Sequence, residues 1–182
     1  MLIEFVNRHF TGMKIDSSQL TESKILDMDG KNMIEILEER GFPINNLYPL
    51  ASARSAGSTI TFKGEEITVQ DADTFDWTQV QIGFFSAGGS ISAKYAPIAA
   101  EQGCVVIDNT SQFRYDDEIP LVVPEVNPDA LEGFELRNII ANPNCSTIQM
   151  VVALKPIDDA AHIERINVAT YQAVAGTGKP AI

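Results

Sequence analysis

Short apolar segments alternate with helical patterns along most of the chain, and this alternation restricts the possible folds more than any other feature. The segments VQIGFF (80–85) and CVVID (104–108) are almost continuously apolar, which is typical of strands that are buried on both faces. Strands that alternate with helices favour a parallel sheet with helices packed on both of its faces. The sequence therefore predicts an α/β fold.

The other predicted elements follow the same alternation. One helix is predicted to end at Gly41, since glycine suits the left-handed position after a helix. Residues 59–69 have the pattern of a β-hairpin, and the last helix is expected to stop near Pro156, because proline disfavours helical geometry in the residue before it. The remaining predicted strands lie at 46–52, 119–126, 137–141 and 164–174, and the predicted helices at 32–41, 91–103 and 146–157.

Polar turns follow four of the predicted strands. The carboxyl ends of parallel strands lie along one edge of a sheet, and α/β folds bind their ligands at that edge. We therefore expect the functional site to be built from these turns, at 51–58, 86–90, 109–114 and 142–146.

Charge and cysteine content exclude several classes of function. The formal net charge of −12 disfavours polyanionic partners, so we expect neither a nucleic-acid nor a membrane partner. No apolar run approaches the roughly 18–20 residues that span a bilayer, and the first 30 residues carry five acidic residues and one arginine, unlike a targeting peptide. With two cysteines and two histidines, neither a disulfide framework nor a metal site is expected. A cytoplasmic protein is expected.

Cys145 is the first candidate for chemistry. It follows a predicted strand and opens a predicted helix, so unpaired N–H groups and the positive end of the helix dipole would face its sulfur. A thiol in that position forms the reactive thiolate more readily, and the same N–H groups would stabilise an oxyanion. The alternative is a small buried residue at a helix start, with Asn144 as an ordinary N-cap. Cys104 lies within a predicted apolar strand and is expected to serve packing.

Two arginines lie in turns at the predicted ligand edge. Arg54 and Ser55 follow the second strand, where dinucleotide folds contact the adenosine ribose, and they favour a 2′-phosphate and hence NADP; the alternative is a solvated loop. Arg114 suits an anionic substrate such as phosphate, and its alternative is an ion pair within 116–118. Gln172, at the end of the last predicted strand, would fix a polar substrate group.

The segments that contain these residues closely resemble the aspartate-β-semialdehyde dehydrogenase family, and the likeness runs from about Met33 to Ile182. The resembling segments are ARSAG (53–57), FFSAGGSISAKYAPIAAEQG (84–103), VIDNTSQFRYDDEIPLVVPEVN (106–127), IIANPNCSTIQMVVALKPI (139–157) and INVATYQAVAGTGK (166–179). The resemblance implies a Rossmann-type NADP-binding domain at 31–141. It also implies that an α+β domain for catalysis and dimerisation begins at 142–182. The full-length family forms homodimers or homotetramers.

The reaction that this resemblance implies is a phosphorylating aldehyde oxidation. Aspartate 4-semialdehyde, phosphate and NADP give aspartyl 4-phosphate and NADPH, and biosynthesis runs the reverse. The step supplies lysine, threonine, methionine and, in bacteria, diaminopimelate.

The same resemblance implies roles for single residues. Cys145 would form the acyl thioester, Arg54 and Ser55 would meet the NADP 2′-phosphate, and Arg114 would bind the substrate phosphate. The remaining implied contacts are Asn144 and Gln172 to the substrate, and Ser86, Ala87, Gly88, Ala175 and Gly176 to the cofactor.

Residues 1–30 depart from the family pattern. They contain only Gly12 and Gly30, so the family's glycine-rich phosphate loop is missing, and the sheet lacks its central first strand unless LIEFV (2–6) substitutes for it. The family's catalytic histidine and substrate-binding arginine lie beyond position 182. Two alternatives therefore stay open. One is a non-catalytic remnant that at most binds a partner subunit, and the other is a related N-acetyl-glutamyl-phosphate reductase.

Overall fold

A six-stranded parallel sheet is the centre of the larger of two structural units. The computed structural model describes residues 21–25 and 28–171, with side chains described from residue 33 onward, and it divides into Met1–Pro143 and Asn144–Ile182. The strand order is β5-β2-β1-β6-β7-β8, and every neighbouring pair is parallel. The strands are β1 (Thr21–Ile25), β2 (Asn46–Ala51), β5 (Gln70–Asp71), β6 (Ile82–Phe85), β7 (Val105–Asp108) and β8 (Ile139–Ala141).

The central strand β1 corrects the expectation that the sheet lacks its first strand. Thr21–Ile25 pairs with β2 on one side and with β6 on the other. The segment LIEFV at 2–6 lies outside the described residues. The helix α2 (Met28–Glu39) follows after residues 26 and 27, and Gly30 lies inside it. TESKI has no apolar run or alternation that would predict a strand; its two neighbours supply the hydrogen bonds.

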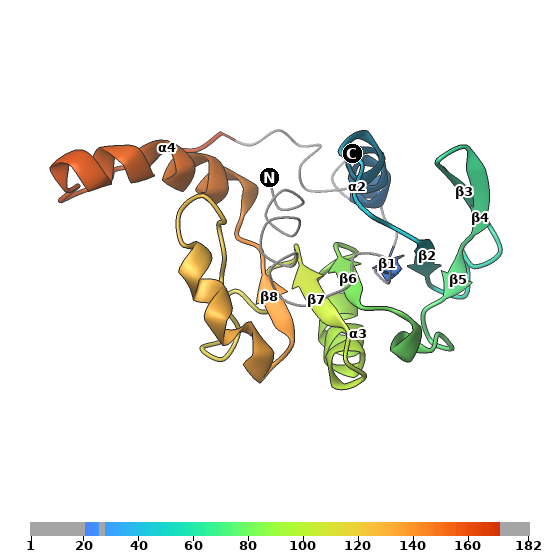
Figure 1. Ribbon diagram of the computed structural model, residues 1–182. Coiled ribbons are helices and arrows are strands. Elements are labelled where there is room, and N and C mark those ends of the chain that lie inside the picture. The colour runs from blue at the N-terminus through green and yellow to red at the C-terminus, as the bar shows by residue number, and fades with distance from the viewer. Residues whose placement is uncertain (1–20, 26–27, 172–182) are drawn as a thin grey trace. The chain divides into compact units, whose positions relative to one another are not determined.

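Side chains alternate between the two faces of the sheet, and each face has its own apolar cluster. Phe84, Ile107 and Ile140 belong to the cluster that includes residues of α2 and of η3 (Pro128–Leu136). Phe85, Val106 and Ile139, each next to one of these residues in the chain, belong to the opposite cluster, which includes residues of α3 (Gly89–Glu101) and η2 (Trp77–Gln79). Figure 1 shows α2 and α3 on opposite sides of the sheet. The predicted α/β fold with helices on both faces is confirmed.

An antiparallel hairpin extends from the edge of this sheet that carries β2 and β5. It consists of β3 (Thr59–Phe62) and β4 (Glu65–Thr68). Lys63 and Gly64 both have positive φ, 50° and 80°, which is the geometry of a tight hairpin turn whose twist matches that of the strands. The hairpin predicted at 59–69 is confirmed.

The strand predicted at 119–126 is wrong. Only Leu121 forms an isolated bridge, to Ala141, while the N–H of Val123 bonds to the side chain of Asn127. Pro120 and Pro124 have no N–H to donate, and a segment with two such gaps does not sustain a strand ladder.

The second unit contains one long helix, α4 (Cys145–Ala161). It runs through Pro156, so the predicted stop is wrong. Proline removes a single intrahelical bond, and the ion pair between Lys155 and Asp159, four residues apart, spans the proline. The sequence predicts a strand at 164–174. Its described part, residues 164–171, is not in a strand. Among the helices in the described part of the chain, none combines the length and apolarity needed to cross a membrane.

Candidate functional site

The turns that follow β2, β6 and β7 share one edge of the sheet in the first unit. Parallel pairing aligns the ends of these strands, for example Phe85 beside Asp108. Arg54 and Ser55 lie in the turn 53–57 after β2, residues 86–88 connect β6 to α3, and the loop to Arg114 follows β7. The sequence therefore located this edge correctly.

The turn after β2 is shaped by backbone hydrogen bonds and leaves Arg54 exposed. The N–H of Ser55 donates to the carbonyl of Ser52 at 2.8 Å, and the N–H of Gly57, with φ of 86°, donates to Val69 at 2.9 Å. Within the described residues the guanidinium of Arg54 has no hydrogen-bond or ion-pair partner. This cation at the carboxyl end of β2 is available to an anionic group of a ligand.

The first turn of α3 offers unpaired backbone donors at the same edge. Gly88 is the N-cap, with φ of 106° and no side-chain cap. The N–H groups of Ile91 and Ser92 bond to its carbonyl, whereas those of Gly89 and Ser90 have no acceptor in the described part of the chain. Such an N-terminus favours a phosphate group, so these residues fit a dinucleotide. Ser86 and Ala87 precede this turn, Ser86 being buried and Ala87 partly buried.

Arg114 is held by backbone carbonyls and not by acidic side chains. Its Nε donates to the carbonyl of Asn142 at 2.9 Å and its Nη2 to that of Asn109 at 3.2 Å. Asn142 Nδ2 donates to Asn109 Oδ1 at 2.6 Å. Glu118 pairs with Arg137 instead, so the alternative of an ion pair within 116–118 is wrong. The remaining nitrogen, Nη1, has no partner among the described residues and is available to an anion.

Asn109 is a site residue that the sequence reasoning missed. It directly follows β7, and its carbonyl accepts a hydrogen bond from Arg114. The signal in the sequence was the polar pair Asp108-Asn109 at the end of an apolar strand, because Asp and Asn at such a position form local turns. That signal marks a turn but does not show which distant side chain the turn supports.

Cys145, in the second unit, is the first residue of α4 and is exposed. Asn144 is the N-cap: its Oδ1 accepts from the N–H of Ser146 at 3.0 Å and from the Ser146 hydroxyl at 2.5 Å. The Cys145 Sγ lies 4.0 Å from the same oxygen. The alternative of a buried cysteine is therefore wrong, while the predicted cap is present.

A hollow of about 470 Å³ lies beside the first turns of α4 within the second unit. It is lined by Ser146, Thr147, Gln149, Met150, Val168, Thr170 and Tyr171, a mixture of polar and apolar groups. The remaining predicted contacts, Gln172, Ala175 and Gly176, lie outside the described residues.

Cys104 contrasts with Cys145. It is fully buried in the cluster around α3, as predicted for a packing residue. Burial raises the pKa of its thiol to about 12, so almost none of it is thiolate at neutral pH.

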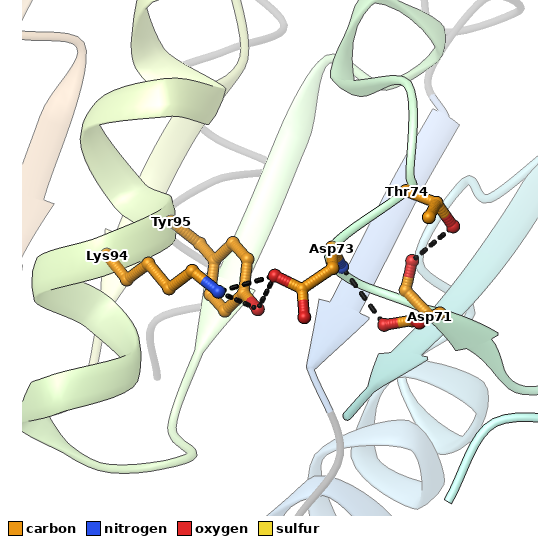
Figure 2. A network of polar contacts seen from close by, with 5 residues as sticks. All are labelled: Asp71, Asp73, Thr74, Lys94 and Tyr95. Atoms are coloured by element: carbon orange, nitrogen blue, oxygen red, sulfur yellow. Dashed lines mark hydrogen bonds and ion pairs between the residues drawn. The ribbon is translucent and has the colours of Figure 1, made fainter. Parts of the chain in front are cut away.

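A polar network ties the turn after β5 to α3 (Figure 2). Strand β5 pairs with β2, the strand that precedes the turn carrying Arg54. Asp73 Oδ1 accepts from the Tyr95 hydroxyl at 2.8 Å and from Lys94 Nζ, and Asp71 Oδ1 accepts from the N–H of Asp73 at 3.1 Å. The Lys94 and then the Tyr95 hydrogen bond hold the pKa of Asp73 below its ordinary value. The same contact with Asp73 raises the pKa of Lys94.

Known proteins that resemble this chain in sequence are semialdehyde dehydrogenases. Residues 27–134 match the family described as semialdehyde dehydrogenase, NAD binding domain. The chain is 70% identical over 153 residues to aspartate-semialdehyde dehydrogenase of Shewanella violacea, covering 84% of this chain and 45% of that protein.

Solved structures that resemble this chain include aspartate semialdehyde dehydrogenases. The crystal structure of aspartate semialdehyde dehydrogenase II from Vibrio cholerae superposes with a TM-score of 0.86 at 61% identity, over 90% of this chain and 49% of that one. A structure of the same enzyme complexed with ASA gives 0.83 at 61% identity, over 88% and 53% of the two chains. The chain thus spans about half the length of these relatives.

The two cysteines predict a large difference in alkylation. At pH 7.5, iodoacetamide should label Cys145 at least about 100-fold faster than Cys104, because one thiol is exposed and the other is buried with a raised pKa. Peptide mass spectrometry of timed samples measures both rates in one experiment. The Cys145→Ser variant should show only the slow reaction, and equal rates at the two cysteines would contradict the structure.

The Asp73–Lys94 pair predicts a contribution to stability that depends on pH. A lowered carboxyl pKa stabilises the fold above the unfolded value, about 3.9, and this is lost as pH falls through the folded pKa. A raised lysine pKa stabilises the fold below the unfolded value, about 10.4, and this stabilisation is lost as pH rises through the folded pKa. The difference in urea midpoint between wild type and Lys94→Gln should therefore be present at pH 7 and shrink below pH 3.

Because both side chains are about half exposed, this difference should be small and should fall further in 1 M salt. In the Asp73→Asn background, Lys94→Gln should no longer change the urea midpoint, because Lys94 then has no carboxylate partner. A midpoint difference that is the same at pH 7 and at pH 2.5 would show that Lys94 acts through packing alone.

Proposed function

We propose that the chain, which belongs to the semialdehyde dehydrogenase family, carries out the NADP-dependent interconversion of aspartate 4-semialdehyde and aspartyl 4-phosphate. The main support is the placement of Cys145, exposed at the start of α4 and preceded by its capping Asn144. The 70% identity to an aspartate-semialdehyde dehydrogenase supports the choice of substrate. The product would enter lysine, threonine, methionine and diaminopimelate synthesis.

Cys145 supplies the nucleophile in this proposal. Its thiolate attacks the aldehyde carbon, the C=O π pair moves to oxygen, and a thiohemiacetal forms. The N–H groups of the first turn of α4 stabilise the negative charge that the attack places on oxygen. Asn144 keeps this turn fixed through its bonds to Ser146, so the donors need no reorganisation.

The cofactor-binding residues in the proposal are those at the carboxyl edge of the sheet. Arg54 would pair with the 2′-phosphate, Ser55 would add a hydroxyl donor, and the N–H groups of Gly89 and Ser90 would bind phosphate oxygens. Bound NADP would accept the hydride that converts the thiohemiacetal into a thioester. The preference for NADP over NAD rests on Arg54, because an acidic residue is typical of NAD-binding sites at this position.

Phosphate completes the cycle. Arg114, already oriented by the carbonyls of Asn109 and Asn142, holds the anion through its free nitrogen. A phosphate oxygen attacks the thioester carbon, the C–S bond breaks, and the electron pair returns to the sulfur of Cys145 as thiolate. Aspartyl 4-phosphate leaves.

One observation favours a second candidate, a non-catalytic remnant of this enzyme. Gly30 lies inside α2, and only residues 26 and 27 separate β1 from that helix. A glycine-rich loop that would cradle the pyrophosphate at this helix is missing from the sequence between them. Turnover by the chain distinguishes the two candidates.

The test is an assay of NADPH formation at 340 nm with aspartate 4-semialdehyde, phosphate and NADP. Wild type should turn over, and Cys145→Ser should lose at least about 1,000-fold, since the nucleophile is removed. Arg54→Leu should raise the KM for NADP about 10-fold or more and leave that for NAD within about two-fold, because only NADP offers a charge to this side chain.

Cys104→Ser is the matched control for the loss of a thiol and should retain turnover. A wild-type chain that binds NADPH but never forms product favours the remnant. A Cys145→Ser variant as active as wild type would overturn the proposed chemistry.

A further inference from the structure

Asp108 is a buried carboxylate for which the proposed reaction gives no role. It is the last residue of β7 and has no exposed surface. In the described part of the chain it forms no ion pair, so its charge is compensated by hydrogen bonds. Oδ1 accepts from the Ser92 hydroxyl at 2.8 Å and from the N–H of Thr110 at 3.0 Å, and Oδ2 accepts from the Thr110 hydroxyl at 2.8 Å.

The bond to Ser92 reaches the cofactor side of the edge. Ser92 is fully buried in the first turn of α3, and its own N–H donates to the carbonyl of Gly88 at 3.1 Å. The hydroxyl therefore fixes the turn that begins at Gly88 to the end of β7. The unpaired N–H groups of Gly89 and Ser90 lie in that turn.

The bonds to Thr110 reach the phosphate side. They turn the chain sharply as it leaves β7, and the Thr110 hydroxyl continues the turn by accepting from the N–H of Gln112 at 3.2 Å. Asn109, which lies between Asp108 and Thr110 in the chain, supplies the carbonyl that orients Arg114. The direction in which the chain leaves β7 thus sets where the guanidinium lies.

The two sides are also in contact with each other. A methyl group added at Gly89 would lie 3.6 Å from Oε1 of Gln112, so the loop after β7 packs against the first turn of α3. Asp108 is hydrogen-bonded to both, through Ser92 on α3 and Thr110 in the loop.

We propose that Asp108 is a positioning residue that holds the cofactor turn and the Arg114 loop in one fixed arrangement. The inference rests on the proposed function, since it assigns NADP to one side and phosphate to the other. We call the hydrogen bonds of Asp108 to Ser92 and to Thr110 its two arms. Removing one arm at a time should weaken the binding of one ligand and not of the other.

Two single-arm variants test this in the full chain. Ser92→Ala removes the arm to α3 and should weaken NADPH binding about five-fold while phosphate binding stays within about two-fold. Thr110→Val keeps the side-chain shape, removes the bond to Oδ2, and should do the reverse. Fluorescence titration measures the NADPH dissociation constant, and calorimetry with inorganic phosphate measures the other.

Thr78→Val is a matched control. Thr78 also follows an aspartate by two residues, and both its N–H and its hydroxyl bond to Asp76 Oδ1; its removal should move neither constant. Asp108→Ala should weaken both ligands. Asp108→Asn keeps an acceptor for Ser92 and the Thr110 N–H and places an amide donor opposite the Thr110 hydroxyl, so it should restore both ligands to within about three-fold of wild type.

The outcomes separate this inference from the function on which it rests. If wild type binds both ligands and the single-arm variants lower only the urea midpoint, Asp108 is merely structural and the inference is wrong. If the two arms weaken both ligands equally, the separate assignment of the arms is wrong. A wild-type chain that binds neither ligand overturns the proposed function and this inference with it.

Discussion

Parallel hydrogen bonding across β1, β6 and β7 is the constraint on which the rest of this structure depends. It gives every strand the same direction, so the turns that follow the strands meet at one edge. Both faces must then be covered, which the two apolar clusters achieve through α2 and α3. Without β1 between β2 and β6, the turn bearing Arg54 and the turn at 86–88 would belong to separate sheets.

The site is ordered mainly by hydrogen bonds to neutral groups. Arg114 bonds to two carbonyls, and Asp108 accepts from hydroxyl and amide groups. Because neither charged group forms an ion pair within the described residues, one nitrogen of the Arg114 guanidinium stays available to an anion. That matters in a chain with a net charge of −12, where long-range attraction for anionic ligands is absent and local cations must bind them.

The sequence predicted those parts of the fold whose signal is local. Strands β6 and β7 were evident because burial on both faces demands continuous apolar residues, and Cys145 was evident because its neighbours mark a helix start. Strand β1 was not, because TESKI is polar and depends on its neighbours. The bracing of Arg114 by Asn109 and Asn142 was also hidden, since the two asparagines are 33 residues apart. Tertiary hydrogen bonds leave no periodic pattern in a sequence.

Amide hydrogen exchange with and without NADPH tests the central claim, that the carboxyl edge of the parallel sheet binds the dinucleotide. We expect NADPH to slow exchange in residues 53–57 and 86–92 and to leave exchange in the hairpin of β3 and β4 unchanged. Protection confined to the hairpin, or absent from both turns at saturating NADPH, would contradict it.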